Sequence, residues 1–417
     1  MSQRRINLRQ GHFYGWIALT GATFAYFGAA CVYYSYGVFL PFICDETGWS
    51  RGLVGGAQSL SYVIFYFLSV SAGFFVGRFG SRKSIILGSL LMIVGLVSLS
   101  QTSASWQLYV FFGLLVGVGY AFTWFVPCTT VAINWFIKKR PLALSIVISS
   151  AGIAGLAIAP ILAYLISSTT WRISWLFLAA IILVLNLGVA GTFVRNRPED
   201  VGQQPDGASG QTSEAGSPEI ESSQTGQWSV GTAMRSLPIW QIVILSVAFM
   251  FALQTMLGHQ VAYLKDIGYS PTVAATTLGL LPGMSIAGRF SYSFLARRFK
   301  PEHIAVGLLG GMLVAVLLFM FMSASSLVCI YVYTVLFGFG YGATLVARTD
   351  MIAVYYGRKI FPQLQGWVFP FQSVAALGPW VAGTIHDTTD SYHLAFIIVL
   401  IVLGVGLLST VFLRPPK

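Results

Sequence analysis

Long apolar runs recur along almost the whole chain, and they constrain its fold more than any other feature. A helix rises about 1.5 Å per residue, so each run is long enough to cross a hydrocarbon core of about 30 Å. No water is present there to bind backbone polar groups, which for runs of this length requires helices. Twelve runs are found, at residues 14–42, 53–76, 84–102, 106–136, 142–167, 173–194, 238–264, 272–296, 303–323, 327–354, 361–385 and 391–413.

The composition agrees with this pattern. Hydrophobic residues make up 56% of the 417 residues and charged residues only 9%, against about 25% charged residues in a typical soluble domain. We therefore predict an all-α, polytopic membrane protein with twelve transmembrane helices in two pseudo-symmetric six-helix bundles. The basic N-terminal segment runs into the first apolar run without a small-residue cleavage pattern, which indicates a retained helix.

The net charge of +11 raises the question of nucleic-acid binding, but its placement argues against such a partner. The N-tail, the C-tail and every second loop together hold 19 Lys and Arg residues, whereas the alternate loops hold three. Positive charge concentrates on the cytoplasmic side of membrane proteins. We predict a multi-pass protein of the cell membrane (inner or plasma membrane) with both termini in the cytoplasm and no nucleic-acid partner.

Nothing in the sequence indicates an enzyme, a metal site or a cofactor. The four cysteines are scattered through or beside apolar runs, without the spacing of a disulfide framework or of metal ligands. No HExxH motif, pair of membrane carboxylates or Gly-rich phosphate loop occurs. We expect neither catalysis nor a cofactor.

A long polar segment, residues 196–236, divides the chain, and its Ser, Gly, Gln and Pro content is typical of a flexible linker. It separates residues 1–195 from residues 237–417, which match each other at an offset near 220. Repeated halves are typical of transporters that alternate access to a site between them. The matching pairs are Gly117–Ala121 with Gly338–Gly342, the surroundings of Pro160 with those of Pro379, and Gly73–Lys83 with Ser293–His303.

Arg289 lies within the apolar run of the stretch Thr272–Phe299. A cation at membrane depth costs at least about 2.5 kcal/mol, so such residues face a bundle interior, a water-filled path or an anion. Its repeat mate, 220 residues earlier, is Ser69. The charge therefore belongs to one half only, which favours a ligand role over an architectural one. A guanidinium forms two parallel hydrogen bonds with a carboxylate.

The loop sequence GFFVGRFGSRK, residues 73–83, resembles the short basic loop after helix 2 of major facilitator superfamily transporters. The matching residues, which we take as a gating loop, are Gly73, Arg78, Gly80, Arg82 and Lys83. The resemblance implies an acidic residue where this chain has Gly77, and its loss predicts that the usual cytoplasmic latch is altered.

Three further segments resemble the monocarboxylate transporter branch and its bacterial oxalate/formate exchanger relatives: FYGWIAL (13–19), YSYGVFLPFI (34–43) and ETGWSRG (46–52). The resemblance makes Arg289 the helix-8 arginine that binds the substrate carboxylate. Relatives that cotransport a proton carry an Asp where this chain has Ser285, and carriers of oxalate add a basic residue on helix 11, which is absent here. One cation suits one carboxylate.

Other polar residues are candidate ligands with structural alternatives. Gln372 and Ser373 on helix 11 either bind a second substrate oxygen or join helices. Tyr120 and its repeat mate Tyr341 either line the site or pack within each half, and Tyr34 lies toward the outer entrance or in an interfacial aromatic belt.

Ionisable residues near the ends of two predicted helices are candidates for proton coupling and for gating. His259 on helix 7 is a candidate proton carrier, with an interfacial or hydrogen-bonded role as its alternative. Arg348 and Asp350 at the end of helix 10 are predicted as interfacial or gate contacts that do not face each other.

We predict a secondary active transporter of small monocarboxylates such as lactate or pyruvate, coupled to protons and functional as a monomer by family resemblance. The missing helix-8 Asp makes exchange of two organic anions the main alternative. The 15% aromatic content keeps export of larger amphipathic compounds open, and a transporter-like receptor that signals through the linker is a further alternative.

Overall fold

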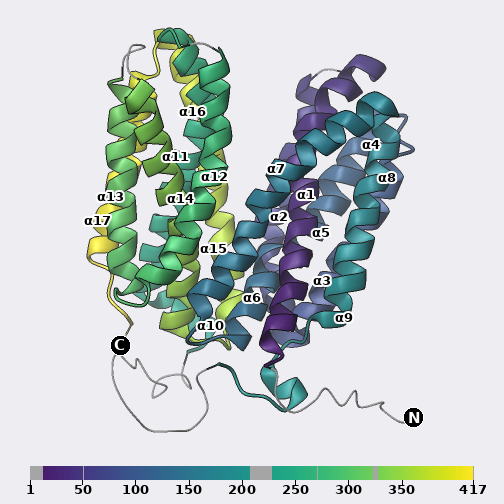
Figure 1. Ribbon diagram of the computed structural model, residues 1–417, viewed down its shortest axis with the longest axis vertical. Helices are drawn as coiled ribbons and strands as arrows, with labels where there is room; N and C mark the ends of the chain where they lie inside the picture. The colour runs from purple at the N-terminus through teal and green to yellow at the C-terminus, as the bar shows by residue number, and fades with distance from the viewer. Residues whose placement is uncertain (1–12, 50, 207–227, 270, 323–326, 417) are drawn as a thin grey trace.

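The computed structural model describes residues 13–49, 51–206, 228–269, 271–322 and 327–416, and it confirms an all-α polytopic membrane protein (Figure 1). The N-terminal part contains α1 (Gly15–Thr47), α2 (Arg51–Phe79), α3 (Ser81–Leu99), α4 (Ser105–Leu108), η1 (Tyr109–Val116), α5 (Gly117–Thr123), α6 (Phe125–Trp135), α7 (Arg140–Ser168), α8 (Trp171–Ile182), η2 (Leu183–Ala190), α9 (Gly191–Phe193) and η3 (Pro198–Val201). The C-terminal part contains α10 (Val230–Arg235), α11 (Leu237–Asp266), α12 (Pro271–Leu295), α13 (Pro301–Met320), α14 (Leu327–Tyr356), α15 (Phe361–Gln372), η4 (Ser373–Ala376), α16 (Leu377–Thr389) and α17 (His393–Val411).

Every predicted apolar run is helical, and the largest difference in a boundary is at the end of α1, which extends to Thr47 where the sequence predicts residue 42. In the described parts of the chain, ten segments are long and apolar enough to cross a membrane. The two remaining runs are α12 and the pair α15 and α16. The first contains Arg289 and an internal proline, Pro282, and the second is interrupted by η4.

Two predicted runs are broken where a proline removes a backbone donor. Pro127 has no N–H for the carbonyl of Thr123, so the run 106–136 breaks at Trp124 and the thiol of Cys128 donates to that carbonyl at 3.2 Å. Pro379 likewise cannot donate to the carbonyl of residue 375, and the backbone there forms the 3₁₀ segment η4.

The helices form two bundles that repeat each other's packing, α1 to α9 in one and α11 to α17 in the other (Figure 1). In the first, Gly119 of α5 packs against the side chain of Met92 on α3; in the second, Gly340 of α14 packs against Met312 on α13. Equivalent small residues thus allow equivalent close approaches at offsets of 221 and 220, which explains the repeat in the sequence.

The beginning of α1, the end of α17 and the described ends of the linker lie at one end of the bundles, which we name the tail end (lower end in Figure 1). The opposite end is the far end. At the tail end the linker's described ends are anchored: Asp206 accepts backbone hydrogen bonds from Ile137, Lys138 and Lys139, and Trp228 packs on Tyr356. Residues 207–227 of the predicted linker lie outside the described residues.

Candidate functional site

Arg289 lies where the two bundles meet, and only 3% of its surface is exposed. Its Nη1 donates a hydrogen bond to the carbonyl oxygen of Ile148 on α7 at 2.9 Å. The backbone carbonyl of Arg289 in turn accepts a hydrogen bond from the hydroxyl of Ser145, also on α7. Arg289 is therefore joined to the opposite half through both its side chain and its backbone.

Tyr341 of α14 holds the other side of the guanidinium. Its hydroxyl accepts a hydrogen bond from Nη2 of Arg289 at 3.1 Å, and the guanidinium carbon lies 5.6 Å from the ring centroid. This geometry depends on glycines that let α12 and α14 approach closely, because Gly288 packs on the carbonyl of Phe339 and Gly342 on that of Ser285. The structure thus brings the two predicted site residues Arg289 and Tyr341 together.

The described residues hold no carboxylate within ion-pair distance of Arg289. Ser285, which replaces the expected Asp, donates its hydroxyl to the carbonyl of Pro282 in its own helix at 2.7 Å. Nε of Arg289 has no hydrogen-bond partner in the described parts of the chain. A buried cation with a free donor and no acidic neighbour is suited to an incoming anion.

The other predicted ligands have different surroundings. Tyr34 of α1 lies in electrostatic range of Arg289 and is 41% exposed. Tyr120 is fully buried beside Tyr33 and Trp124, and its hydroxyl has no partner among the described residues.

On α15, Gln372 is fully buried and neither of its amide atoms has a partner in the described residues. Ser373 donates its hydroxyl to the carbonyl of Pro370 in the same helix at 2.6 Å. Of this predicted pair, Gln372 therefore has unused hydrogen-bonding capacity for a ligand.

His259, the predicted proton carrier, is held through both ring nitrogens. Nε2 lies 2.8 Å from the carbonyl oxygen of Pro379, and Nδ1 lies 3.2 Å from the hydroxyl of Tyr392. A carbonyl can only accept, so Nε2 carries a proton and the neutral ring can accept from the tyrosine at Nδ1. This arrangement joins α11 to α16 and the start of α17.

The predicted gating loop lies at the tail end, and its residues have distinct roles. Gly80 has a φ of +87°, which favours glycine at the turn between α2 and α3. Arg82 donates from its backbone N–H to Asn196 at 3.0 Å and from Nε to the carbonyl of Gly191 at 2.7 Å, which attaches the loop to the start of the linker. Arg78 lies over the ring of Phe79, and Lys83 is exposed.

Two glycines of this loop contact α15 of the other half. Gly73 packs against the carbonyl of Pro362, and a Cβ atom at Gly77 would overlap with the side-chain amide of Gln363. The space that an acidic residue would fill in the resembling pattern is therefore occupied by a glutamine from the opposite half, which explains the departure at Gly77.

Further contacts between the halves lie at the tail end. Nη1 of Arg140 on α7 lies 3.6 Å from Oδ1 of Asp350 on α14, and Asp350 also accepts a hydrogen bond from Tyr292 at 2.8 Å. Arg358, which follows α14, donates to the carbonyl of Asn134 at 2.9 Å, and burial lowers the pKa of its guanidinium. Asp350 therefore contacts the opposite half, and its role as a gate stays a prediction.

Arg348 differs from the interfacial alternative of its prediction, because it is fully buried with 0% exposure, and its role as a gate contact stays a prediction. Its guanidinium carbon lies 5.4, 5.8 and 5.6 Å from the ring centroids of Phe125, Phe249 and Phe369. Sequence reasoning underestimated this residue because its position near the end of a helix suggested access to water. The sequence did contain a signal for a buried role, because Arg348 is the second arginine within a predicted span.

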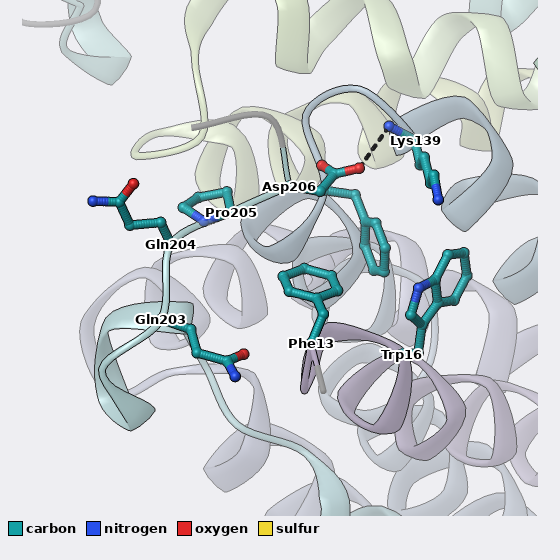
Figure 2. Close-up of a pocket in the computed structure, with 8 residues that line it drawn as sticks. Phe13, Trp16, Lys139, Gln203, Gln204, Pro205 and Asp206 are labelled. Atoms are coloured by element: carbon teal, nitrogen blue, oxygen red, sulfur yellow. Dashed lines mark hydrogen bonds between the residues drawn. The ribbon is translucent and has the colours of Figure 1, made fainter. Parts of the chain in front are cut away.

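A surface cavity of about 490 Å³ lies at the tail end, between the start of α1, the α6–α7 turn and the linker (Figure 2). It is lined by aromatic rings, amides and one Lys: Phe13, Trp16, Phe136, Lys139, Gln203, Gln204, Pro205 and Asp206. None of the predicted ligand residues is among them, so this cavity is separate from the site at Arg289.

The comparisons with known proteins identify the family. The model of the Major Facilitator Superfamily matches residues 22–376. The chain belongs to this superfamily. Among curated relatives it is 24% identical to monocarboxylate transporter 13 of Bos taurus over 401 residues, covering 95% of this chain and 89% of that one. It is 26% identical to monocarboxylate transporter 12 of Xenopus laevis, covering 85% and 77%.

These similarities make the chain a monocarboxylate-transporter-like member of the major facilitator superfamily, a transporter of small molecules and not an enzyme. Solved structures share the fold. A variant of the E. coli fucose:proton symporter FucP aligns with a TM-score of 0.76 at 14% identity, over 97% of this chain and 100% of that one. FucP in its outward conformation aligns with a TM-score of 0.73 at 15% identity.

Proposed function

We propose that this superfamily member is a secondary active transporter of small monocarboxylates of the lactate or pyruvate kind. One observation carries the proposal: a buried guanidinium, Arg289, sits between the halves with a free Nε donor and no carboxylate beside it among the described residues. The relatives named monocarboxylate transporters support the same substrate class.

In this proposal the carboxylate of the substrate binds Arg289 and Tyr341. The guanidinium already joins the halves through its hydrogen bond to the backbone carbonyl of Ile148. A substrate carboxylate that replaces this carbonyl gives Arg289 a charged acceptor in place of a neutral one. Charge-assisted hydrogen bonds are about twice as strong as neutral ones. Releasing Ile148 also loosens the contact between α7 and α12, which couples binding to movement of the halves. Tyr120, Gln372, Ser373 and Tyr34 remain candidates for the rest of the substrate.

We propose proton coupling, with the proton carried by the substrate acid itself, by water or by His259. The hydrogen bonds of His259 favour the first two carriers. The alternative is exchange of two organic anions, which is favoured by Ser285, since its hydroxyl is bound within its own helix and offers no titratable carboxylate.

In the proposed organisation, residues 1–195 and 237–417 form the two bundles and residues 196–236 form a cytoplasmic linker. The protein is a monomer in the cell membrane with both termini in the cytoplasm, and it has no nucleic-acid partner. The basic residues counted above support this orientation. Two polar contacts between the halves, Arg140 with Asp350 and Arg358 with Asn134, lie at the tail end. They support a conformation closed toward the cytoplasm.

The test is uptake of radiolabelled lactate into proteoliposomes, with and without an inward proton gradient. We compare wild type with Arg289→Gln, Arg289→Lys and Tyr341→Phe, and use Arg172→Gln as the charge-matched control because Arg172 pairs with Glu46 on the exposed surface. Losing a buried charged partner costs about 2–5 kcal/mol, so Arg289→Gln is expected to weaken lactate binding at least about 30-fold.

Each outcome separates the alternatives. Gradient-driven uptake that is lost in Arg289→Gln supports proton-coupled transport. Arginine-dependent uptake that needs an internal anion and ignores the gradient establishes exchange. Uptake unchanged by Arg289→Gln removes Arg289 as the carboxylate ligand, and Arg289-dependent binding without flux supports a receptor.

A further inference from the structure

Arg348 is a second fully buried guanidinium in the same inter-half region, and the site at Arg289 does not use it. None of its three side-chain nitrogens has a hydrogen-bond partner in the described parts of the chain. Three aromatic faces surround it, from Phe125 in one half and from Phe249 and Phe369 in the other. Aromatic faces attract a cation but accept no conventional hydrogen bond from it, so its donors remain free.

Nearby acidic groups do not neutralise Arg348. Asp350 lies only two residues away, but it pairs with Arg140 and Tyr292. The described residues hold no carboxylate within 4.0 Å of the Arg348 guanidinium. A buried charge without a partner is strongly disfavoured, so this environment is suited to an anion that arrives from outside the protein.

Arg348 and the Arg289 site are linked through α14. Tyr341, which holds Arg289, and Arg348 are seven residues apart on α14, which places them on one helix face about 10.5 Å apart along the axis. Tyr26 of α1 lies in electrostatic range of Arg289, and its ring centroid is 6.0 Å from that of Phe125, one of the rings around Arg348.

Polar side chains flank Arg348 on the facing helix. Phe369 of α15 covers the guanidinium, and Gln365 and Gln372 lie one turn before and after it on the same face. Both glutamines are fully buried, and both have amide nitrogen and oxygen atoms without partners in the described residues. Amide N–H donors on the helix that covers the guanidinium can add to the donor set that a carboxylate requires.

We propose that Arg348, with Gln372, forms a second anion subsite, and that the transporter therefore also takes a short dicarboxylate, with its first carboxylate at Arg289 and Tyr341. The inference rests on the proposed carboxylate site. The offset of about 10.5 Å along α14 separates the two subsites, so a ligand that uses both must carry its two carboxylates at opposite ends of a short carbon chain. Because helix 11 lacks a basic residue, the sequence predicted one cation and one carboxylate. A second cation at Arg348 removes that limit.

The experiment compares succinate with butyrate, two four-carbon acids that differ in the second carboxylate, and includes lactate as the probe of the first subsite. Binding is measured by calorimetry on purified full-length protein in nanodiscs, for wild type, Arg348→Gln, Arg348→Lys and Arg289→Gln. Arg172→Gln is the control for an equal loss of charge at the surface. Folding is checked by thermal unfolding and gel filtration.

Wild type is expected to bind succinate at least about tenfold more tightly than butyrate, the equivalent of about 1.4 kcal/mol. Arg348→Gln should abolish this preference and change lactate and butyrate binding less than twofold, while Arg348→Lys retains part of it. Arg289→Gln should weaken all three ligands.

Other results overturn the inference. If wild type binds lactate through Arg289 but does not prefer succinate, or if the preference survives in Arg348→Gln, the second subsite is wrong and the proposed function stands. If neither lactate nor succinate binds, the proposed function fails with it. Because the preference is measured first in wild type, misfolding of Arg348→Gln does not prevent a decision.

Discussion

Gly366 of α15 packs directly against the backbone carbonyl of Ser69 on α2, with no room between them for a Cβ atom. One turn farther along α2, Gly73 packs in the same way on the carbonyl of Pro362. The two halves therefore meet backbone to backbone at these positions. A rigid contact of this kind has little tolerance for volume, so it can hold the tail end closed in one state and release it in the other.

Gly366→Ala is predicted to weaken closure of the tail end. Overpacking a tight contact costs about 1–3 kcal/mol, which shifts the equilibrium between closed and open forms about 5- to 150-fold. We expect slower uptake and faster labelling of Gln363→Cys by a membrane-impermeant maleimide applied to the tail end. The control is Gly310→Ala on α13, where an added Cβ meets no atom within 4 Å. Equal labelling of both variants would contradict the assignment.

The ion pair between Arg140 and Asp350 leads to a second prediction. Each charge comes from a different half, and both side chains are largely buried, with 12% and 5% exposure. Asp350→Asn removes the charge but keeps an acceptor for Tyr292, so we expect uptake to fall about tenfold, in line with the loss of a part-buried charge partner. Exchanging the charges, Arg140→Asp with Asp350→Arg, should restore part of the rate.

A double-mutant cycle measures this coupling directly. The charge-exchanged protein must transport faster than either single reversal, because each single reversal places two like charges together. Additive losses in the two single variants and the double variant would show that the residues act independently.

Much of the fold could be predicted from the sequence because lipid permits few alternatives. An apolar run of the right length must be helical, and its charge pattern sets its direction. The helix breaks at Trp124 and at η4 were harder to predict from the sequence, although Pro127 and Pro379 cause them. Proline is tolerated in membrane helices when a neighbour satisfies the freed carbonyl, and the thiol of Cys128 could be found only in three dimensions.

The candidate site was also predictable only in part. Arg289 could be singled out because a cation in an apolar run requires a function or a partner. Its partners could not, since Ile148 is 141 residues away in the sequence and belongs to the other half. For Arg348, the aromatic faces that enclose it come from three helices that only the tertiary structure brings together.

A third prediction concerns the far end, outside the membrane spans. Glu46, in the last turn of α1, accepts hydrogen bonds from Arg172 and from Nε1 of Trp171, and these hold the pKa of the Glu46 carboxyl below its ordinary value. A depressed pKa in the folded state stabilises the protein above the unfolded-state pKa, and this stabilisation is lost as the pH falls through the folded-state value. Glu46→Gln should therefore lower the melting temperature at pH 7, and the difference from wild type should disappear as the pH falls below the folded-state pKa of Glu46.

Thermal unfolding of the two proteins in detergent between pH 7 and pH 3 measures this difference. Because the pair is exposed, the shift at pH 7 should be small. Asp45→Asn, the neighbouring exposed carboxylate for which no ion pair is found in the described residues, serves as the control. A difference between wild type and Glu46→Gln that grows at acidic pH would have the wrong sign.

His259 provides the last prediction. Both ring nitrogens are already used, by the carbonyl of Pro379 at 2.8 Å and the hydroxyl of Tyr392 at 3.2 Å, so its primary effect should be to join α11 to α16 and α17. His259→Gln keeps one donor for the carbonyl. We expect it to destabilise the protein by about 1–2 kcal/mol, the cost of imperfect buried hydrogen bonds, while lactate uptake retains its full response to a proton gradient.

The deciding measurement pairs gradient-driven uptake with counterflow, which needs no net proton movement. Retention of both by His259→Gln assigns the proton to the substrate acid or to water. Loss of gradient-driven uptake with intact counterflow would instead identify His259 as the proton carrier. Tyr392→Phe separates the two roles, because it removes the hydroxyl at Nδ1 and leaves the imidazole in place. If His259 carries the proton, the response of lactate uptake to the gradient should change in this variant. If His259 is purely structural, only the stability of the protein should fall.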